Sequence, residues 1–295
     1  MINPVPDGSA FNEYYYRNCC GLPYARNETW LRFFGLAADR IVADINPRTV
    51  LDAGCAIGLL VEALRERGVD ARGIDLSAYA IGTVPEALRP YCTEGSIAEP
   101  FGQRVDLITC IEVLEHMPAD EADRAIVNFA QHTNDILFSS TPFDYREPTH
   151  VNVRMPEDWA EAFARQGFYR DVDFDASFIT KWAVRLTRRS PAPQRLVRDY
   201  ERRFWQLRTA EYDARAYSLE IQQRLEGVEK ERDRLAPFEP EVRDLRARSG
   251  DLEETANKLR QELTGARNTI AAMERSLFWR ARLLSVRLRD IFRRK

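Results

Sequence analysis

Short apolar runs alternate with amphipathic stretches between Thr49 and about Arg188. The runs typical of β-strands are 49–53, 71–75, 105–112, 135–140, 169–175 and 179–186, and helical periodicity fills 59–67, 78–88, 119–131 and 156–166. This alternation predicts a doubly wound α/β fold, in which a parallel sheet is covered by helices on both faces. No helix separates the last two strands, so we expect an antiparallel hairpin at one edge of the sheet.

The pattern changes after Ser190–Pro193, which we interpret as a hinge, because no strand signal follows it. One mainly apolar position recurs every seven residues, at Tyr200, Leu207, Ala214, Ile221, Val228 and Leu235, before Pro237 and Pro240 interrupt the helix. Two interleaved series follow, Leu245, Leu252, Leu259, Ala266 and Met273, and Ala256, Leu263, Ile270 and Leu277. Their spacing predicts a coiled coil and, through it, a homo-oligomer. The alternative is a long amphipathic helix that packs on the rest of the same chain.

The last residues, 279–295, keep a helical period but become strongly basic. A basic amphipathic tail of this kind suits an anionic membrane surface or an acidic partner, so we predict peripheral contact with the inner face of the cell membrane. The alternative is a solvated helix end whose cations complement the helix dipole.

Charge divides the chain into two parts. Residues 1–190 hold 19 Lys/Arg against 28 Asp/Glu, a net charge of −9, whereas the remainder holds 24 against 18, a net charge of +6. An acidic globular part argues against nucleic acid as a partner. The five cysteines form no CxxC pair and no zinc-type set, so we predict no metal ligand and expect reduced thiols. With no signal-peptide pattern and no membrane-spanning run, we expect a cytoplasmic protein.

The segment Val50–Gly58, VLDAGCAIG, ends a strand, turns and feeds a helix. Glycines in such a turn allow the backbone to approach a ligand, and the carboxylate of Asp52 is suited to bind an ammonium group or to order the loop. GIDLS, residues 73–77, follows at the end of the next strand, where an acidic residue accepts hydrogen bonds from the ribose of a nucleoside. These two motifs alone leave a nicotinamide dinucleotide and S-adenosyl-L-methionine both open.

Taken in order, VLDAGCAIG, GIDLS, DLITCIEVLEHMP and ILFSSTP resemble the class I S-adenosylmethionine-dependent methyltransferases over about residues 30–188. The chain is most similar to the branch whose fourth strand ends in Glu-Val-Leu-Glu-His, which includes small-molecule methyltransferases and many encoded for bacterial surface-glycan assembly. The resemblance implies a seven-stranded, mostly parallel sheet with S-adenosyl-L-methionine as cofactor. Ala56 departs from the pattern, because the family usually has glycine there, but we expect its methyl group to be tolerated.

The resemblance also implies which residues contact the cofactor. The methionine part is surrounded by Asp52, Gly54, Cys55 and Gly58, with the Cys55 thiol packing rather than reacting. The nucleoside is held by Asp75 at the ribose, and by Leu76, Ser96 and Ile97 around the adenine. The centre of the cofactor faces Ile111 and Glu112.

Methyl transfer requires alignment of acceptor, carbon and sulfur, and an oxygen or nitrogen acceptor also requires removal of its proton. Of the three histidines, His116 and His150 follow strands on the side where the family's acceptor pocket opens, so we predict that one of them is a general base. The alternative for His116 is packing within its loop, and His132 is expected to be structural. We further expect Val172–Asp175 to line the acceptor pocket, and Tyr24 and Arg26 to reach the cofactor carboxylate.

These expectations divide the chain into a helical lid over residues 1–48, a methyltransferase domain at 49–190, a helix at 191–236, a coiled coil at 241–278 and the basic tail at 279–295. We predict O-methylation of a sugar or lipid-linked glycan, with a soluble small metabolite as the alternative acceptor. A non-catalytic coiled-coil scaffold with a vestigial cofactor site is the rival of a different class. A nicotinamide oxidoreductase is disfavoured, because GCAIG lacks the G-x-G-x-x-G spacing.

Overall fold

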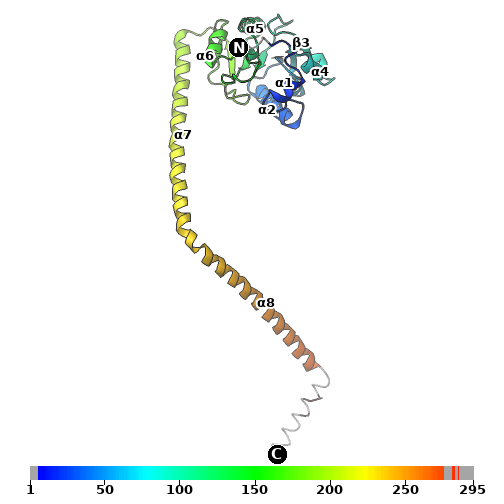
Figure 1. Ribbon diagram of the computed structural model, residues 1–295, viewed down its shortest axis with the longest axis vertical. Helices are drawn as coiled ribbons and strands as arrows, with labels where there is room; N and C mark the ends of the chain where they lie inside the picture. The colour runs from blue at the N-terminus through cyan, green and yellow to red at the C-terminus, as the bar shows by residue number, and fades with distance from the viewer. Residues whose placement is uncertain (1–5, 276–280, 283–284, 286–295) are drawn as a thin grey trace, which may run out of the picture. The chain divides into compact units, whose positions relative to one another are not determined.

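The computed structural model describes residues 6–275, 281, 282 and 285. The chain divides into two units, Met1–Leu207 and Arg208–Lys295. The first unit contains the sheet and the helices that cover it, and the second, over residues 208–275, consists of long helix (Figure 1).

Seven strands in the described part of the chain form one sheet with the order β3-β2-β1-β4-β5-β7-β6. Their bounds are β1 Thr49–Ala53, β2 Asp70–Asp75, β3 Cys92–Glu94, β4 Leu107–Ile111, β5 Asp135–Ser139, β6 Phe168–Arg170 and β7 Val184–Arg188. β1 to β5 are parallel, whereas β7 is antiparallel to both β5 and β6. The predicted seven-stranded, mostly parallel sheet with an antiparallel edge hairpin is therefore confirmed.

Helices cover both faces of this sheet. They are α1 Glu13–Asn18, α2 Glu28–Asp44, α3 Leu59–Glu66, α4 Ala78–Thr83, α5 Ala119–His132 and α6 Pro156–Ala164, with short 3-10 helices η1 Arg89–Tyr91 and η2 Leu114–His116. Side chains along a strand point alternately to its two faces, so β5 contributes to two cores. Leu137 packs in the core that contains α2 and α3, whereas Ile136 and Phe138 pack in the core that contains α5 and α6.

The sequence pattern misplaced some element boundaries. The strand expected at 169–175 is only Phe168–Arg170, because Asp171 and Asp175 accept hydrogen bonds from the backbone N–H groups of Asp173 and Ser177. Such local bonds compete with a β-ladder. The strand expected at 179–186 begins only at Val184. The helix expected at 78–88 ends at Thr83, ahead of Pro85, whose ring disfavours helical backbone at the preceding residue.

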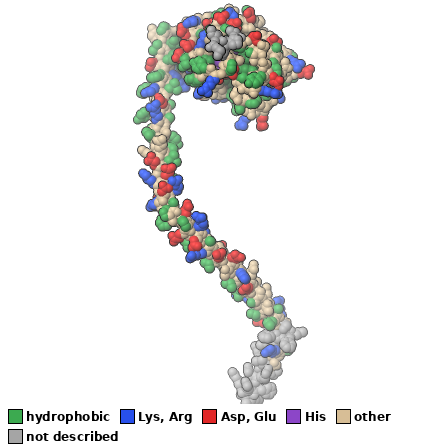
Figure 2. Space-filling view, viewed as in Figure 1, with side chains coloured by type: hydrophobic (Ala, Val, Ile, Leu, Met, Phe, Trp, Pro, Cys, Tyr) green, Lys and Arg blue, Asp and Glu red, His purple; other side chains and the backbone are tan. Residues whose placement is uncertain are grey.

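Beyond the sheet, α7 Pro193–Leu235 and α8 Glu239–Arg275 are joined by the 3-10 helix η3 Ala236–Phe238. Neither long helix has a buried residue, and apolar side chains lie among charged ones along both (Figure 2). No helix in the described part of the chain is long and apolar enough to span a bilayer. The basic tail expected at 279–295 lies outside the described residues, apart from 281, 282 and 285.

Candidate active site

A cavity of about 810 Å³ opens at the carboxyl ends of β1, β2 and β4. This is the edge where open α/β sheets bind their ligands. All of the residues expected to contact the cofactor line the cavity except Gly58 and Arg26. Gly58 instead caps α3 with a φ of 78°, and a side chain there would press on the Cys92 thiol. Its contribution is therefore to the turn that enters the helix.

The turn after β1 is shaped by residues with positive φ. Gly54 has a φ of 86°, and an added Cβ would overlap the side chain of Val113 in the loop after β4. Ala56 has a φ of 48°, a conformation that an L-residue adopts only at some cost. The family's usual glycine avoids this cost, so the expected tolerance of the Ala56 methyl group comes with backbone strain. The backbone N–H of Ala56 donates a 2.7 Å hydrogen bond to Asp75 Oδ2.

Asp75 is held at the end of β2 by two backbone donors. Besides Ala56, the N–H of Ser77 donates to Asp75 Oδ1 at 2.8 Å, and burial raises the pKa of the carboxyl group. Each carboxylate oxygen has more than one acceptor site, so both remain able to accept a ribose hydroxyl. Leu76 beside it is 45% exposed and presents an apolar surface at the cavity wall.

Asp52 is the buried carboxyl group of the site, with only 5% of its surface exposed. Thr109 Oγ1 on β4 donates a 2.7 Å hydrogen bond to Asp52 Oδ1. Burial raises the pKa of Asp52 to about 7, against the smaller opposing effect of Thr109. A cationic ligand beside this buried carboxyl group would favour its ionised form and so lower its pKa.

Glu112 follows β4 with a φ of 54°, which is uncommon for a residue other than glycine. Its Oε1 accepts hydrogen bonds from Ser139 Oγ at 2.6 Å and from Trp182 Nε1 at 2.8 Å. Trp182 thereby fixes the loop before β7 to the end of β4. Strained residues that the surrounding structure holds in place are frequent at functional sites.

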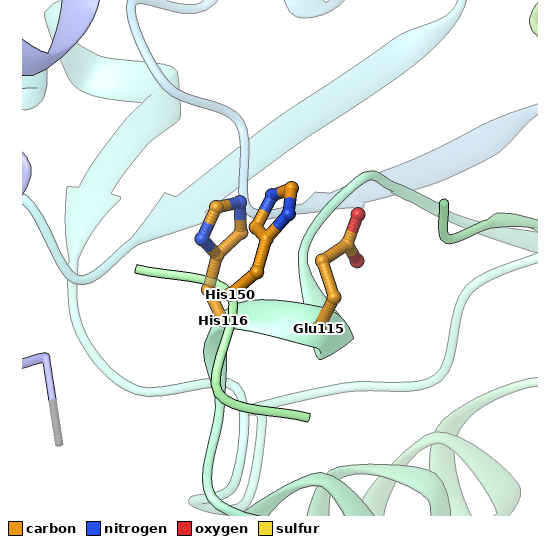
Figure 3. A group of neighbouring side chains, drawn as sticks. All are labelled: Glu115, His116 and His150. Carbon is orange, nitrogen blue, oxygen red and sulfur yellow. The ribbon is translucent and has the colours of Figure 1, made fainter. Parts of the chain in front are cut away.

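His116 and His150 both line the same cavity, with ring centroids 4.6 Å apart. His116 Nδ1 lies 2.9 Å from Thr149 Oγ1 and its Nε2 lies 3.3 Å from the hydroxyl of Tyr15. Burial and the neighbouring His150 lower the pKa of His116 to about 3. Figure 3 shows the two imidazoles side by side, next to the carboxylate of Glu115. The structure thus joins the two predicted histidines, and their role as a general base stays a prediction.

His132 lies apart from this cavity, because its two ring nitrogens contact the carbonyl oxygens of Asn128 and Phe101. Val172–Asp175 do not line the cavity either, and Ile179, Thr180 and Trp182 take that place. Asp173 instead pairs with Arg202 of α7. Tyr24 lines the cavity, whereas Arg26 is bound to Glu62 through its Nη2 and Nε atoms.

The amino-terminal segment supplies the aromatic side chains of the cavity wall. These are Phe11, Tyr15, Tyr16, Tyr24, Trp30, Phe33 and Phe34. The cluster of aromatic residues before the first strand was the sequence signal for this wall. Nothing in the local pattern indicated Trp182, which lines the cavity from the loop before β7, or Thr149, which contacts His116.

The donor set fits S-adenosyl-L-methionine. Two carboxyl groups, Asp52 and Asp75, face the same cavity as the glycine turn, about where a cation and a ribose are expected to lie. The side-chain-free surface at Gly54 keeps the backbone accessible, and Leu76 with Ile97 offers apolar walls for a flat base. Together the fold and this site define a class I S-adenosylmethionine-dependent methyltransferase domain.

Comparison with known proteins supports this class. The family model described as a methyltransferase domain matches residues 24–171, half of the chain, and the chain belongs to this family. S-adenosyl-L-methionine is accordingly its cofactor.

Two curated relatives are named ubiquinone biosynthesis O-methyltransferase. That of Methylococcus capsulatus is 37% identical over 107 residues, which cover 32% of this chain and 43% of the relative. That of Alkalilimnicola ehrlichii is 33% identical over 103 residues, covering 32% and 41% respectively. The matches thus span less than half the length of these relatives.

Among solved structures, the magnesium protoporphyrin IX methyltransferase of Synechocystis PCC 6803 with bound SAH is 18% identical, with a TM-score of 0.47. The match covers 62% of this chain and 100% of that one. An amino pentose methyltransferase of Micromonospora echinaspora is 16% identical, with a TM-score of 0.45, and the match covers 56% of this chain and 93% of that one.

Proposed function

We propose that the chain is an O-methyltransferase, which moves the methyl group of S-adenosyl-L-methionine to a hydroxyl group on an acceptor that carries a flat ring. The observation that supports this most directly is that a single cavity is lined both by the cofactor residues and by Tyr15, His116 and His150, which we take as its acceptor end. An acceptor bound there would share one cavity with the cofactor. In-line transfer requires this proximity, because the acceptor oxygen must approach the methyl carbon directly.

The chain's own residues bind and orient the reactants. Asp75 accepts hydrogen bonds from the ribose, and Asp52 faces the cationic methionine part. The cofactor supplies a methyl group on a positively charged sulfur. As the acceptor oxygen bonds to the methyl carbon, the carbon–sulfur bond breaks and its electron pair stays on sulfur. The proton of the acceptor hydroxyl would pass to His116 or His150, the predicted general base, and the products would be a methyl ether and S-adenosylhomocysteine.

An aromatic hydroxyl is the acceptor we favour. Phe11, Tyr15 and Trp182 line the cavity and provide surfaces on which an aromatic ring packs well. The two relatives above carry the name of an O-methyltransferase of ubiquinone biosynthesis, and this agrees with an aromatic acceptor.

A sugar hydroxyl, the acceptor expected from the sequence, is the second candidate. Asp144, Thr180 and Glu121 also line the cavity, and these side chains can bind the several hydroxyl groups of a sugar. The relatives reported above give no support to a glycan acceptor, so we place it second.

The first experiment is calorimetric titration of the full chain with S-adenosylhomocysteine. We expect micromolar binding that Asp75→Ala weakens by at least about tenfold, since a ribose contact is lost. Asp70→Ala is the matched control: it removes a carboxylate from the other end of β2, where Asp70 pairs with Arg65 outside the cavity. A folded wild type that binds no cofactor would overturn the enzyme proposal and favour the scaffold.

The acceptor is then tested by supplying S-adenosyl-L-methionine with a catechol series and, separately, with free and nucleotide-linked hexoses. Mass spectrometry of the products identifies which compounds gain a methyl group and on which atom. Methylated catechols with unmodified sugars are expected. If only sugars are methylated, the proposal of an aromatic acceptor is wrong, whereas the proposal of O-methyl transfer remains.

A further inference from the structure

Glu115, His116 and His150 bring metal-ligating atoms together at the acceptor end of the cavity. One nitrogen of each imidazole and one carboxylate oxygen of Glu115 all lie within 4.8 Å of one another. Glu115 and His116 belong to η2 after β4, and His150 comes from the loop after β5 (Figure 3). The donors therefore come from two segments that are separated in the sequence.

Hydrogen bonds indicate which nitrogen of each ring carries a lone pair. The hydroxyl of Thr149 donates its proton to Glu147 Oε1 at 2.9 Å, so it accepts from His116 Nδ1–H. His150 Nδ1 lies 2.7 Å from the carbonyl oxygen of Asp144, which can only accept. Both rings therefore keep Nε2 unprotonated and able to bind a metal, with the ring orientation fixed through Nδ1. His116 Nε2, which lies 3.3 Å from the hydroxyl of Tyr15, would exchange that contact for the ion.

Glu115 provides a second, independent observation. Its side chain is fully buried, and Oε2 has no hydrogen-bond partner, while Oε1 accepts one bond from the N–H of Thr141 at 3.3 Å. A buried carboxylate with an unsatisfied oxygen is unfavourable unless a proton or a cation accompanies it. The carbonyl oxygen of Glu115 also accepts bonds from the N–H groups of Val151 and Asn152, which holds the His150 loop against η2.

We propose that Glu115, His116 and His150 bind one divalent transition-metal ion, of the Zn²⁺ or Mn²⁺ type, at the acceptor end of the cavity. Two imidazoles and one carboxylate leave further coordination positions open, as in catalytic metal sites. Since His116 and His150 line the cavity, those positions face the acceptor. The ion orients the acceptor hydroxyl and makes its proton easier to lose. This role rests on the proposed O-methyl transfer, whereas the metal site itself does not.

The test measures metal binding directly. Full-length protein treated with a chelator and then freed of it is titrated with Mn²⁺ and, separately, with Zn²⁺, by calorimetry and, for Mn²⁺, by electron paramagnetic resonance. One ion per chain is expected. Glu115→Gln and His150→Ala are expected to weaken binding by at least about tenfold, since each removes one ligand. His132→Gln is the matched control, because His132 lies outside the cavity. The His132→Gln protein should bind the ion as tightly as wild type.

Titration with S-adenosylhomocysteine in the absence of metal reports whether each variant still folds and binds the cofactor. Glu115→Gln should retain cofactor affinity while losing the ion, because its amide has nearly the shape of the carboxylate. Wild type that binds the cofactor but no ion, or variants that bind the ion as tightly as wild type, would overturn the metal site and leave the proposed function intact. In that case the prediction that His116 or His150 is a general base would remain.

Discussion

Single residues around the cofactor space reduce the stability of the folded chain, through burial of a carboxyl group or backbone strain, in ways that a purely structural domain would avoid. Asp52 is a carboxyl group buried with one hydrogen-bonding side chain, and Ala56 and Glu112 hold positive φ angles without being glycine. All three face the cavity. Because such costs persist where binding or catalysis requires them, their concentration here supports the assignment of the site.

Asp52 should make the stability of the free protein depend on pH. Its pKa is raised from 3.8 to about 7, so the folded state keeps a proton that the unfolded chain releases. Stabilisation from this group is complete below its unfolded pKa and is lost as pH rises to about 7. Relative to Asp52→Asn, whose oxygen can still accept from Thr109, wild type should lose about 1.4 kcal/mol of unfolding free energy per pH unit in that window.

Urea unfolding of wild type and Asp52→Asn at several pH values between 4.5 and 8, each without cofactor, measures this difference. Comparing the two proteins removes the contribution of every other titrating group, provided that the remaining structure is unchanged. A difference that stays constant across the range would show that Asp52 titrates normally in the folded chain.

At the scale of elements, the turn between β1 and α3 is fitted against the loop after β4. Gly54→Ala should therefore weaken cofactor binding, because the new methyl group overlaps Val113 and displaces one loop or the other. Gly68→Ala at the far end of α3 is a close control. Gly68 has a φ of 81° but no atom within 4 Å of an added Cβ, so it imposes backbone strain without crowding.

Both variants should lose about 1 kcal/mol or more of stability from the left-handed backbone. Calorimetric titration with S-adenosylhomocysteine should show a loss of at least about tenfold for Gly54→Ala and little change for Gly68→Ala. Equal effects on affinity would mean that backbone strain, and not the fit against Val113, limits the turn.

The elements that the sequence predicted well are those in which one local pattern decides the structure. The apolar run 105–112 predicted a strand, which is β4, and the glycine turn with Asp75 indicated where the cofactor residues gather. The acceptor end depends on contacts that no local pattern reveals. Tyr15 lies 101 positions from His116, and Trp182 lies 70 positions from Glu112. The sequence predicted no metal ligand, and the set proposed here depends on the same kind of contact, since His150 meets Glu115 only after β4 and β5 pair.

For the whole molecule, the exposed apolar side chains of α8 need a partner. Leu245, Leu252 and Leu259 occupy one heptad position, and Leu263 and Ile270 occupy the other; all five are exposed. We propose that α8 pairs with a second copy of this chain in a parallel, two-stranded coiled coil. The residues that flank this seam support the parallel register: Arg248 would face Glu253 of the second copy, and Glu262 would face its Arg267.

Light scattering coupled to size exclusion should give the full chain twice its mass of 34.1 kDa. Leu252→Asp with Leu259→Asp should yield monomers, because charges enter the apolar seam, whereas Gln261→Lys on the outer face should not.

The charge pairing has its own test. Arg248→Glu places like charges together and should weaken the dimer, and adding Glu253→Arg in the same chain should restore it. Restoration requires the two residues to face each other across copies, so its failure in a protein that is still dimeric would indicate an antiparallel pair.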